Sequence, residues 1–203
     1  MSHTAAEPRA ASPMPTWDIA KIFPSQGNWS VPEYLSLNGN YFVEFDNGHV
    51  EVLPMPSEKH QDIVLFLYSL LLAFSRGGRI GKAMVAPLRV RLDLGKFREP
   101  DVLFMKAEHA DRRHNDYWDG ADLVMEVVSD DDRRRDLETK RQEYAWAGIP
   151  EYWIVDPRDQ QITVLTLAGE RYAEHGVYKA GQRAASVLLA GFDVAVSEVF
   201  AEH

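Results

Sequence analysis

The stretch that decides the fold is residues 122–157, which read DLVMEVVSDDDRRRDLETKRQEYAWAGIPEYWIVDP. It starts with an almost continuous apolar run, LVMEVV, which is typical of a buried strand. Three consecutive Asp residues then begin a helix that we predict to end near Ala147, because Gly148 stands at the expected C-cap and Pro150 just beyond it. EYWIVDP follows as a second apolar strand. The centre of the chain therefore predicts a helix placed between two core strands.

Upstream of this stretch, β patterns and helical patterns follow one another. Residues 41–55, YFVEFDNGHVEVLPM, contain two alternating runs around an Asn-Gly pair, which indicates a β-hairpin. Ser57 can cap a helix, and apolar residues at helical spacing extend it to about Ser75, where Arg-Gly-Gly terminates it. Before the hairpin, VPEYLSL places Pro32 at the first position of a short helix.

Further strands are expected on both sides of the deciding stretch. Residues 82–93, KAMVAPLRVRLD, read as a strand with a break at Pro87, EPDVLFM is the next strand, and residues 109–120 are expected to form a loop. QQITVLTL forms a hairpin with EYWIVDP, and weaker β segments and a short helix follow it. The fold class is therefore α/β (α+β mixed), a mixed β-sheet flanked by helices, with an N-terminal hairpin and C-terminal β segments.

Composition narrows the class of protein. The 203 residues include 22 basic and 31 acidic side chains, a formal net charge of −9, and 45% are hydrophobic. This composition excludes disorder of the whole chain, and the acidic balance argues against a protein that coats nucleic acid indiscriminately. The chain has no Cys, which excludes disulfides, thiolate metal sites and a cysteine nucleophile, and fits a reducing cytoplasm.

The N-terminal end differs in character from the rest of the chain. Residues 1–15 are rich in Ala, Pro and Ser and are expected to form a disordered tail, which leaves residues 16–203 as a single domain. The tail lacks the apolar stretch of a signal peptide, and the longest apolar-rich run, residues 63–74, is about half of the roughly 20 residues that span a bilayer. We expect a soluble, cytoplasmic protein with no membrane partner.

Two acidic residues stand inside apolar runs. Asp101 lies between Pro100 and Val-Leu-Phe, and Glu126 is the sole polar residue of LVMEVV. A buried carboxylate is costly unless it is paired or binds a metal ion. The alternatives for Glu126 are a buried pair with an Arg, or an edge strand on which the side chain faces water.

Lys140 in the predicted helix shares a face with residues on either side of it. Leu137 precedes it by three positions and Tyr144 follows it by four, so all three are expected to face the sheet. The alternative is an exposed ion pair of Lys140 with Asp136. An Asp, a Glu on a neighbouring strand and a Lys can carry out metal-assisted hydrolysis: the carboxylates hold a hard divalent cation, and the Lys orients water or stabilises developing charge.

At these residues the sequence resembles a known group. EPDVLFM together with residues 122–157 is similar to the Uma-type family of predicted endonucleases, in the PD-(D/E)XK restriction-endonuclease-like superfamily. The resemblance runs from about Tyr34 to Leu167. It implies a restriction-endonuclease-like core. It also implies that the protein is a hydrolase, a magnesium- or manganese-dependent endonuclease, and that its partner is nucleic acid, with DNA expected before RNA. It also implies a homodimer, since such enzymes often pair to cut both strands.

The resemblance also assigns roles to particular residues. The Pro-Asp of the superfamily falls on Asp101 and its second acid on Glu126, so both are catalytic and metal-binding candidates. The usual Lys position, two residues after the second acid, is occupied by Val128, and the resemblance places the catalytic Lys on the following helix, at Lys140. Three further residues are candidates for the site. Glu44 is either an additional metal ligand or a residue on the surface of its strand, and His60 is either a site residue or a histidine of the core or helix cap. Tyr144 is a candidate because it shares the helix face of Lys140.

Two other readings of the same sequence stay open. In one, the chain is a non-catalytic binding or regulatory module that keeps the nuclease-like fold. In the other, it is a dimeric scaffold without a nucleic-acid partner. Residues 133–141 contain five bases and two acids, a local charge of +3 next to the expected site. This run favours a focused contact with nucleic acid over the broad coating that the global charge excludes.

Overall fold

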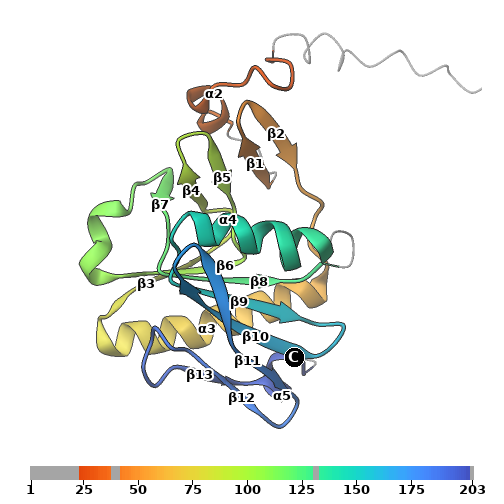
Figure 1. Cartoon of the computed structure of the whole chain (residues 1–203), viewed down its shortest axis with the longest axis vertical. Coiled ribbons are helices and arrows are strands. Elements are labelled where there is room, and N and C mark those ends of the chain that lie inside the picture. Colours follow the sequence, from red (N-terminus) through yellow and green to blue (C-terminus); the bar gives the residue numbers. More distant parts are fainter. Residues whose placement is uncertain (1–22, 38–41, 130–132, 202–203) are drawn as a thin grey trace, which may run out of the picture.

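The computed structural model describes residues 23–37, 42–129 and 133–201. The expected tail, residues 1–15, and the three Asp residues expected to begin the central helix lie outside these ranges. The central element is a six-stranded sheet in the order β11-β10-β9-β8-β6-β3 (Figure 1). Its strands are β3 (Gly81–Val85), β6 (Val102–Lys106), β8 (Leu123–Val127), β9 (Glu151–Asp156), β10 (Gln161–Ala168) and β11 (Arg171–Lys179). β8 and β9 are parallel and the other pairs antiparallel, so the expected mixed sheet is confirmed.

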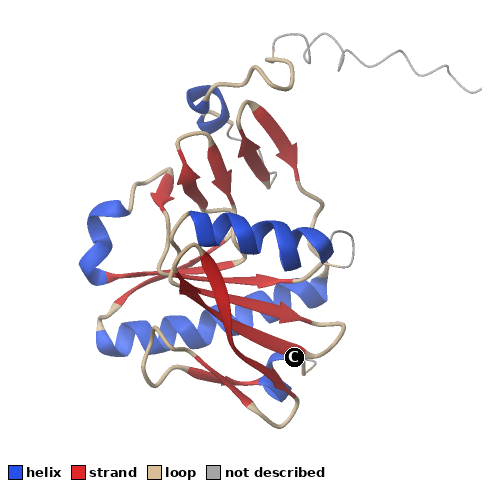
Figure 2. Cartoon of the chain, in the orientation of Figure 1, coloured by secondary structure: helices blue, strands red, loops and turns tan. Residues whose placement is uncertain are grey.

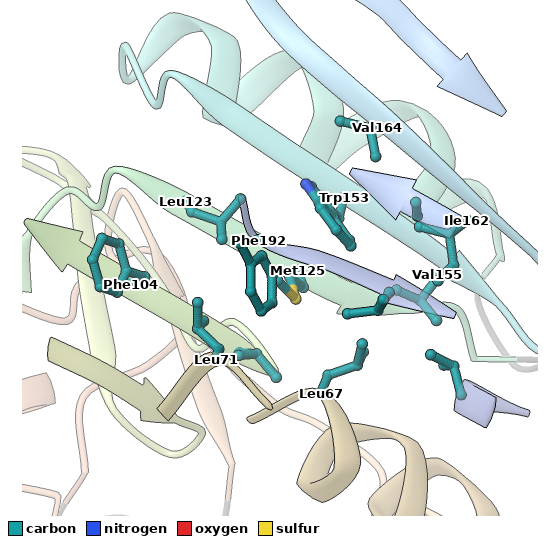
Figure 3. Packing of buried hydrophobic residues seen from close by; sticks show 14 of the residues in the cluster. Leu67, Leu71, Phe104, Leu123, Met125, Trp153, Val155, Ile162, Val164 and Phe192 are labelled. Atoms are coloured by element: carbon teal, nitrogen blue, oxygen red, sulfur yellow. The ribbon is translucent and has the colours of Figure 1, made fainter. Parts of the chain in front are cut away.

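Helices cover both faces of this sheet (Figure 2). On one face lies α3 (Glu58–Gly78), whose apolar stripe packs on alternate residues of β8: Figure 3 shows Leu67 and Leu71 beside Leu123 and Met125. On the other face lies α4 (Lys140–Trp146). Its buried residues Tyr144 and Ala145 belong to the same hydrophobic cluster as Val124 of β8. Because side chains alternate along a strand, Glu126 points to the same face as Val124, toward α4.

The start of α3 agrees with the sequence, and its end does not. Ser57 caps the helix, since its Oγ accepts a hydrogen bond from the backbone N–H of His60 at 3.2 Å. The helix continues through both glycines to Gly78, and Arg79, with φ of 49°, is the left-handed residue that closes it. The predicted stop at the Arg-Gly-Gly run was therefore three residues early.

A second sheet of five strands, in the order β2-β1-β5-β4-β7, stands beside the first. Its strands are β1 (Val43–Asp46), β2 (His49–Val52), β4 (Arg89–Asp93), β5 (Lys96–Arg98) and β7 (Tyr117–Asp119). β1 and β2 form the expected hairpin, with positive φ at Asn47 and Gly48. The expected break at Pro87 separates β3 from β4, which belong to different sheets. The short helix α2 (Val31–Leu35) packs on this sheet through Tyr34, which stacks on Phe45.

Two other segments complete the described chain. The region expected to be a loop contains η1 (Ala107–Arg112) and β7, so that prediction was wrong: β7 is held by a parallel partner, β4, distant in sequence. The C-terminal part is β12 (Arg183–Ala185), β13 (Asp193–Ala195) and α5 (Val196–Val199), as expected. None of the described helices has the length and apolar character needed to cross a membrane.

The helix between β8 and β9 has an irregular first part. Over residues 135–139 it is a π-helical segment, η2 (Arg135–Thr139), which passes directly into α4. Gly148, with φ of 73°, follows the end of α4, which agrees with the predicted stop. The predicted helix is thus confirmed over its described residues, and the π-helical segment was not predicted.

Candidate functional site

A cavity of about 880 Å³ opens at the end of the six-stranded sheet, between the start of α3, the segment after β2 and the η2–α4 helix. Its lining includes four residues singled out from the sequence: His60, Asp101, Glu126 and Lys140. They come from the first turn of α3, the residue before β6, β8, and the first residue of α4. Residues scattered over 80 positions of the chain therefore meet at one cavity, because β6 and β8 are neighbours and α3 and α4 cover opposite faces.

Asp101 is held in place by the neighbouring strand. Its Oδ2 accepts a hydrogen bond from the backbone N–H of Val127 at 2.8 Å. Val127 follows Glu126, and Val102 pairs with Met125 in the antiparallel register of β6 and β8. The register therefore sets the Asp101 carboxylate beside the part of β8 that carries Glu126.

Glu126 is almost completely buried, with 1% of its surface exposed, and both of its oxygens are bonded. Oε2 accepts from Nζ of Lys140 at 2.9 Å, and Oε1 accepts from the hydroxyl of Tyr144 at 2.5 Å. Lys140 Nζ also lies 3.0 Å from Oδ1 of Asp136. The ion pair of Lys140 with Asp136 weighed from the sequence therefore exists, but it is buried and shared with Glu126.

Burial and neighbouring charges both affect the pKa values of this pair. Burial raises the pKa of Glu126, nearby Asp101 and Asp136 raise it further, and the ammonium of Lys140 opposes them. Burial lowers the pKa of Lys140, but Glu126 and Asp136 outweigh it and hold that pKa well above its ordinary value. Lys140 is therefore a fixed cation at neutral pH, suited to donate hydrogen bonds rather than to accept a proton.

His60 reaches the same place from α3. Its Nε2 lies 3.3 Å from Oδ2 of Asp101 and 3.2 Å from the carbonyl oxygen of Val127. Burial lowers the pKa of His60, but the hydrogen bond and charge of Asp101, with Glu126 nearby, raise it above its usual value. The other ring nitrogen, Nδ1, is buried with no hydrogen-bond partner in the described structure. His60 is thus a cavity residue with hydrogen-bond partners at Nε2 and none among the described residues at Nδ1.

Glu44 and Tyr144 do not line the cavity. Glu44, on β1, accepts hydrogen bonds from Arg135 and from the backbone N–H of Glu99, and it lies 3.5 Å from Arg98. Its predicted role as a metal ligand stays a prediction, since the structure pairs it with cations and separates it from the cavity. Tyr144 stands behind Glu126, where it orients the carboxylate.

The oxygen atoms at the cavity suit a hard cation in part. Asp101, Glu126 and the carbonyl of Val127 are oxygen ligands of the kind that Mg²⁺ and Mn²⁺ prefer. One nitrogen, Nε2 of His60, reaches both Oδ2 of Asp101 and the Val127 carbonyl, so these two oxygens converge on one point. The described part of the chain contains no group of three or more His, Asp or Glu side chains placed to hold a metal ion. A cation here would need water or a substrate phosphate to complete its ligands.

Two buried acidic residues of the cavity were not identified from the sequence. Asp136 was considered only as an exposed partner of Lys140, yet it is buried and its Oδ2 also accepts from the backbone N–H of Ser129 at 3.3 Å. Glu99, next to Pro100-Asp101, is buried and accepts from the backbone N–H of Val43 at 3.1 Å. Burial raises the pKa of Glu99 to about 8. The spacing of four from Lys140 was the available signal for Asp136, and the polar position next to Pro-Asp was the one for Glu99.

Comparisons with known proteins agree on the type of protein. A sequence model of the family described as Uma2, putative restriction endonuclease, matches residues 31–197. No curated protein gives a match. A crystal structure described as a putative nuclease belonging to DUF820, from Anabaena variabilis, is similar with a TM-score of 0.69 and 18% sequence identity, over 85% of this chain and 97% of that one. This likeness confirms the predicted fold class.

Proposed function

The chain belongs to the Uma2 family, and on this premise we propose that it is a metal-dependent endonuclease that hydrolyses phosphodiester bonds in DNA. One observation carries the proposal: Asp101, Glu126 and Lys140 all line the same cavity. Two carboxylates and a fixed cation form a set that can hold a divalent metal ion and stabilise the charge that develops on a phosphoryl oxygen. The homodimer and the cytoplasmic location expected from the sequence stay predictions.

In this proposal Asp101 and Glu126, with the carbonyl of Val127, would hold Mg²⁺ or Mn²⁺. The bound metal ion would supply a water of lowered pKa and neutralise charge on the phosphoryl group. Lys140, held by Glu126 and Asp136, keeps its proton and donates a hydrogen bond to the attacking water or to the developing oxyanion. The hydroxyl of Tyr144 fixes the orientation of the Glu126 carboxylate.

The test compares the wild-type protein with Glu126→Gln and Asp101→Asn on supercoiled plasmid, linear duplex and single-stranded oligonucleotides, with Mg²⁺, Mn²⁺ or EDTA. We expect cleavage by the wild type that requires metal, and a loss of at least about a hundredfold in both variants. Glu174→Gln, at an exposed position on β11, is the matched control and should cleave as the wild type does. Cleavage that survives Glu126→Gln would remove the basis of the proposal.

A second readout does not depend on turnover. A metal ion that binds the folded state stabilises it, so Mn²⁺ should raise the melting temperature of the wild type. Asp101→Asn should lose most of that increase, and Glu174→Gln should keep it.

One observation favours the alternative of a non-catalytic binding or regulatory module. Both oxygens of Glu126 are already bonded, to Lys140 and Tyr144, and a metal ion must compete for them. Titration calorimetry with Mg²⁺ and Mn²⁺ separates the two functions. Binding of either ion that is lost in Asp101→Asn supports the endonuclease, whereas no binding of either ion supports the module.

A further inference from the structure

The cations that line the cavity are of two kinds. Arg135 and Lys140 are neutralised inside the protein: Arg135 pairs with Glu44 and Glu51, and Lys140 with two carboxylates of the cavity. Lys59 and Arg158 also line the cavity, but both are exposed. Neither side chain has an ion pair or hydrogen bond to a residue that the structure describes. Each can therefore bind an external anion without breaking a contact to any of the described residues.

These two cations come from two different elements that contact the end of β8, the strand of Glu126. Lys59 belongs to the first turn of α3, next to His60, whose ring reaches the carbonyl of Val127. Arg158 follows β9, which runs parallel to β8 and accepts a hydrogen bond from the N–H of Val128 at the carbonyl of Val155, at 2.8 Å. The cavity that both residues line also holds the carboxylates of the proposed site.

Because the chain is acidic, a polyanion could bind at the cavity only where exposed cations offset its charge. The formal net charge is −9, and five carboxylates (Glu51, Glu99, Asp101, Glu126 and Asp136) line the cavity itself. A nucleic-acid strand would be repelled unless exposed cations compensated for its phosphates where it enters. An Arg can bind a phosphate through two parallel hydrogen bonds, and a Lys binds one as a point charge.

We infer that Lys59 and Arg158 bind the phosphates on either side of the phosphodiester bond to be cut, and so set the path of the substrate strand across the cavity. This inference rests on the proposed function, because it takes the cavity that the two cations line as the place of cleavage. The wall at residues 53–56, which includes the exposed side chain of Met55, offers an apolar surface to the sugars and bases of that strand.

The test measures binding apart from cleavage. Fluorescence anisotropy of a labelled 20-nucleotide DNA, single-stranded and duplex, is recorded in EDTA over a range of salt concentrations. We expect Lys59→Gln/Arg158→Gln to weaken binding at least tenfold. We also expect it to reduce the slope of log Kd against log salt by about 1.4 to 1.8, since each phosphate contact contributes about 0.7 to 0.9. The control pair, Arg171→Gln/Lys179→Gln, removes two exposed cations of β11 outside the cavity and should change Kd less than twofold.

The outcomes separate this inference from the proposed function. If the wild type cleaves DNA but the two double variants bind alike, or if the wild type does not bind, the assignment of Lys59 and Arg158 fails. If Lys59→Gln/Arg158→Gln alone loses binding while no metal supports cleavage by the wild type, the strand path holds and the hydrolytic function fails. In an active protein, the same variant should raise KM about tenfold and leave kcat within twofold. Circular dichroism shows that each variant is folded.

Discussion

The ammonium of Lys140 lies 2.9 Å from Oε2 of Glu126, and both side chains are buried. Both charges are largely removed from solvent, so each depends on its partner for compensation. The same pair that gives the proposed site its cation also joins β8 to α4. We therefore expect this one contact to contribute both to the proposed function and to stability.

Replacing Lys140 by Met should lower the free energy of unfolding by about 3–5 kcal/mol, because it leaves Glu126 and Asp136 buried without their cation. Glu126→Gln/Lys140→Met should lose less than the sum of the two single variants. Urea denaturation at pH 7 measures this cycle. Lys179→Met, at an exposed position, should change stability by less than about 0.5 kcal/mol. Additive losses in the cycle would show that the pair is not coupled.

Replacing Asp136 by Asn removes one of the two carboxylates that hold Lys140. If Lys140 acts on the reacting phosphate, Asp136→Asn should reduce kcat at least tenfold and change KM less than threefold, because Asp136 positions the cation without contacting the substrate. Steady-state cleavage kinetics measure both constants. Glu138→Gln is the control, since Glu138 lies in the same π-helical segment and pairs with exposed Arg134. Equal kcat values for the two variants would contradict the role of Asp136.

The hydroxyl of Tyr144 should matter for activity as well as for stability. Tyr144→Phe removes its hydrogen bond to Glu126 and should lower the free energy of unfolding by about 1–3 kcal/mol. Tyr172→Phe removes another buried hydroxyl, which donates to the carbonyl of Ile149 at 2.7 Å outside the cavity, and should cost a similar amount. Only Tyr144→Phe should also reduce cleavage. A loss of cleavage in both variants would point to general destabilisation.

Glu143 gives a prediction for pH. Burial favours its neutral form, but the hydrogen bonds and charges of Arg98 and Lys96 outweigh this and hold the pKa of Glu143 below its ordinary value of about 4.5. Because the pKa is lowered on folding, the ionised carboxylate stabilises the fold at pH values above about 4.5. This contribution is lost as the pH falls from there through the lower pKa of Glu143 in the folded protein. Glu143→Gln should therefore cost about 2–4 kcal/mol at pH 7.

The difference in unfolding free energy between wild type and Glu143→Gln should shrink as the pH falls below about 4.5, because the Gln resembles the protonated Glu. Urea titrations at pH 7, 4.5 and 3.5 measure it. Exposed Glu174→Gln should show no such pH-dependent difference. A difference that stays constant over the range would mean that the charge of Glu143 contributes nothing.

Much of the fold could be predicted because local pattern and tertiary structure agree. LVMEVV is an apolar run, and it forms β8, buried on both faces. The Asn-Gly pair forms the turn between β1 and β2, and Ser57 caps α3. The failures are segments whose structure depends on distant partners. β7 is three residues long and pairs with β4, each residue with a partner 28 positions away, so no periodicity of its own indicates a strand.

The same distinction applies to the candidate site. Asp101 and Glu126 could be recognised because a carboxylate in an apolar run is unusual, and the structure places both at the cavity. The surroundings of Glu44 could not be predicted, because its partner Arg135 lies 91 positions away and the pattern of β1 does not reveal it. The burial of Asp136 could not be predicted either, since a spacing of four from Lys140 occurs equally in exposed ion pairs.

The π-helical segment before Lys140 sets how many residues separate Asp136 and Arg135 from Lys140 on one helical turn. A π-helical turn holds about one more residue than an α-helical turn, so deletion of one residue within positions 137–139 would allow a regular helix with little rotation of its upstream part. Asp136 would then stand three rather than four positions before Lys140, and Arg135 four rather than five, so the contacts of Asp136 with Lys140 and of Arg135 with Glu44 would be displaced. Related chains should therefore tolerate substitutions in this segment more readily than a change in its length.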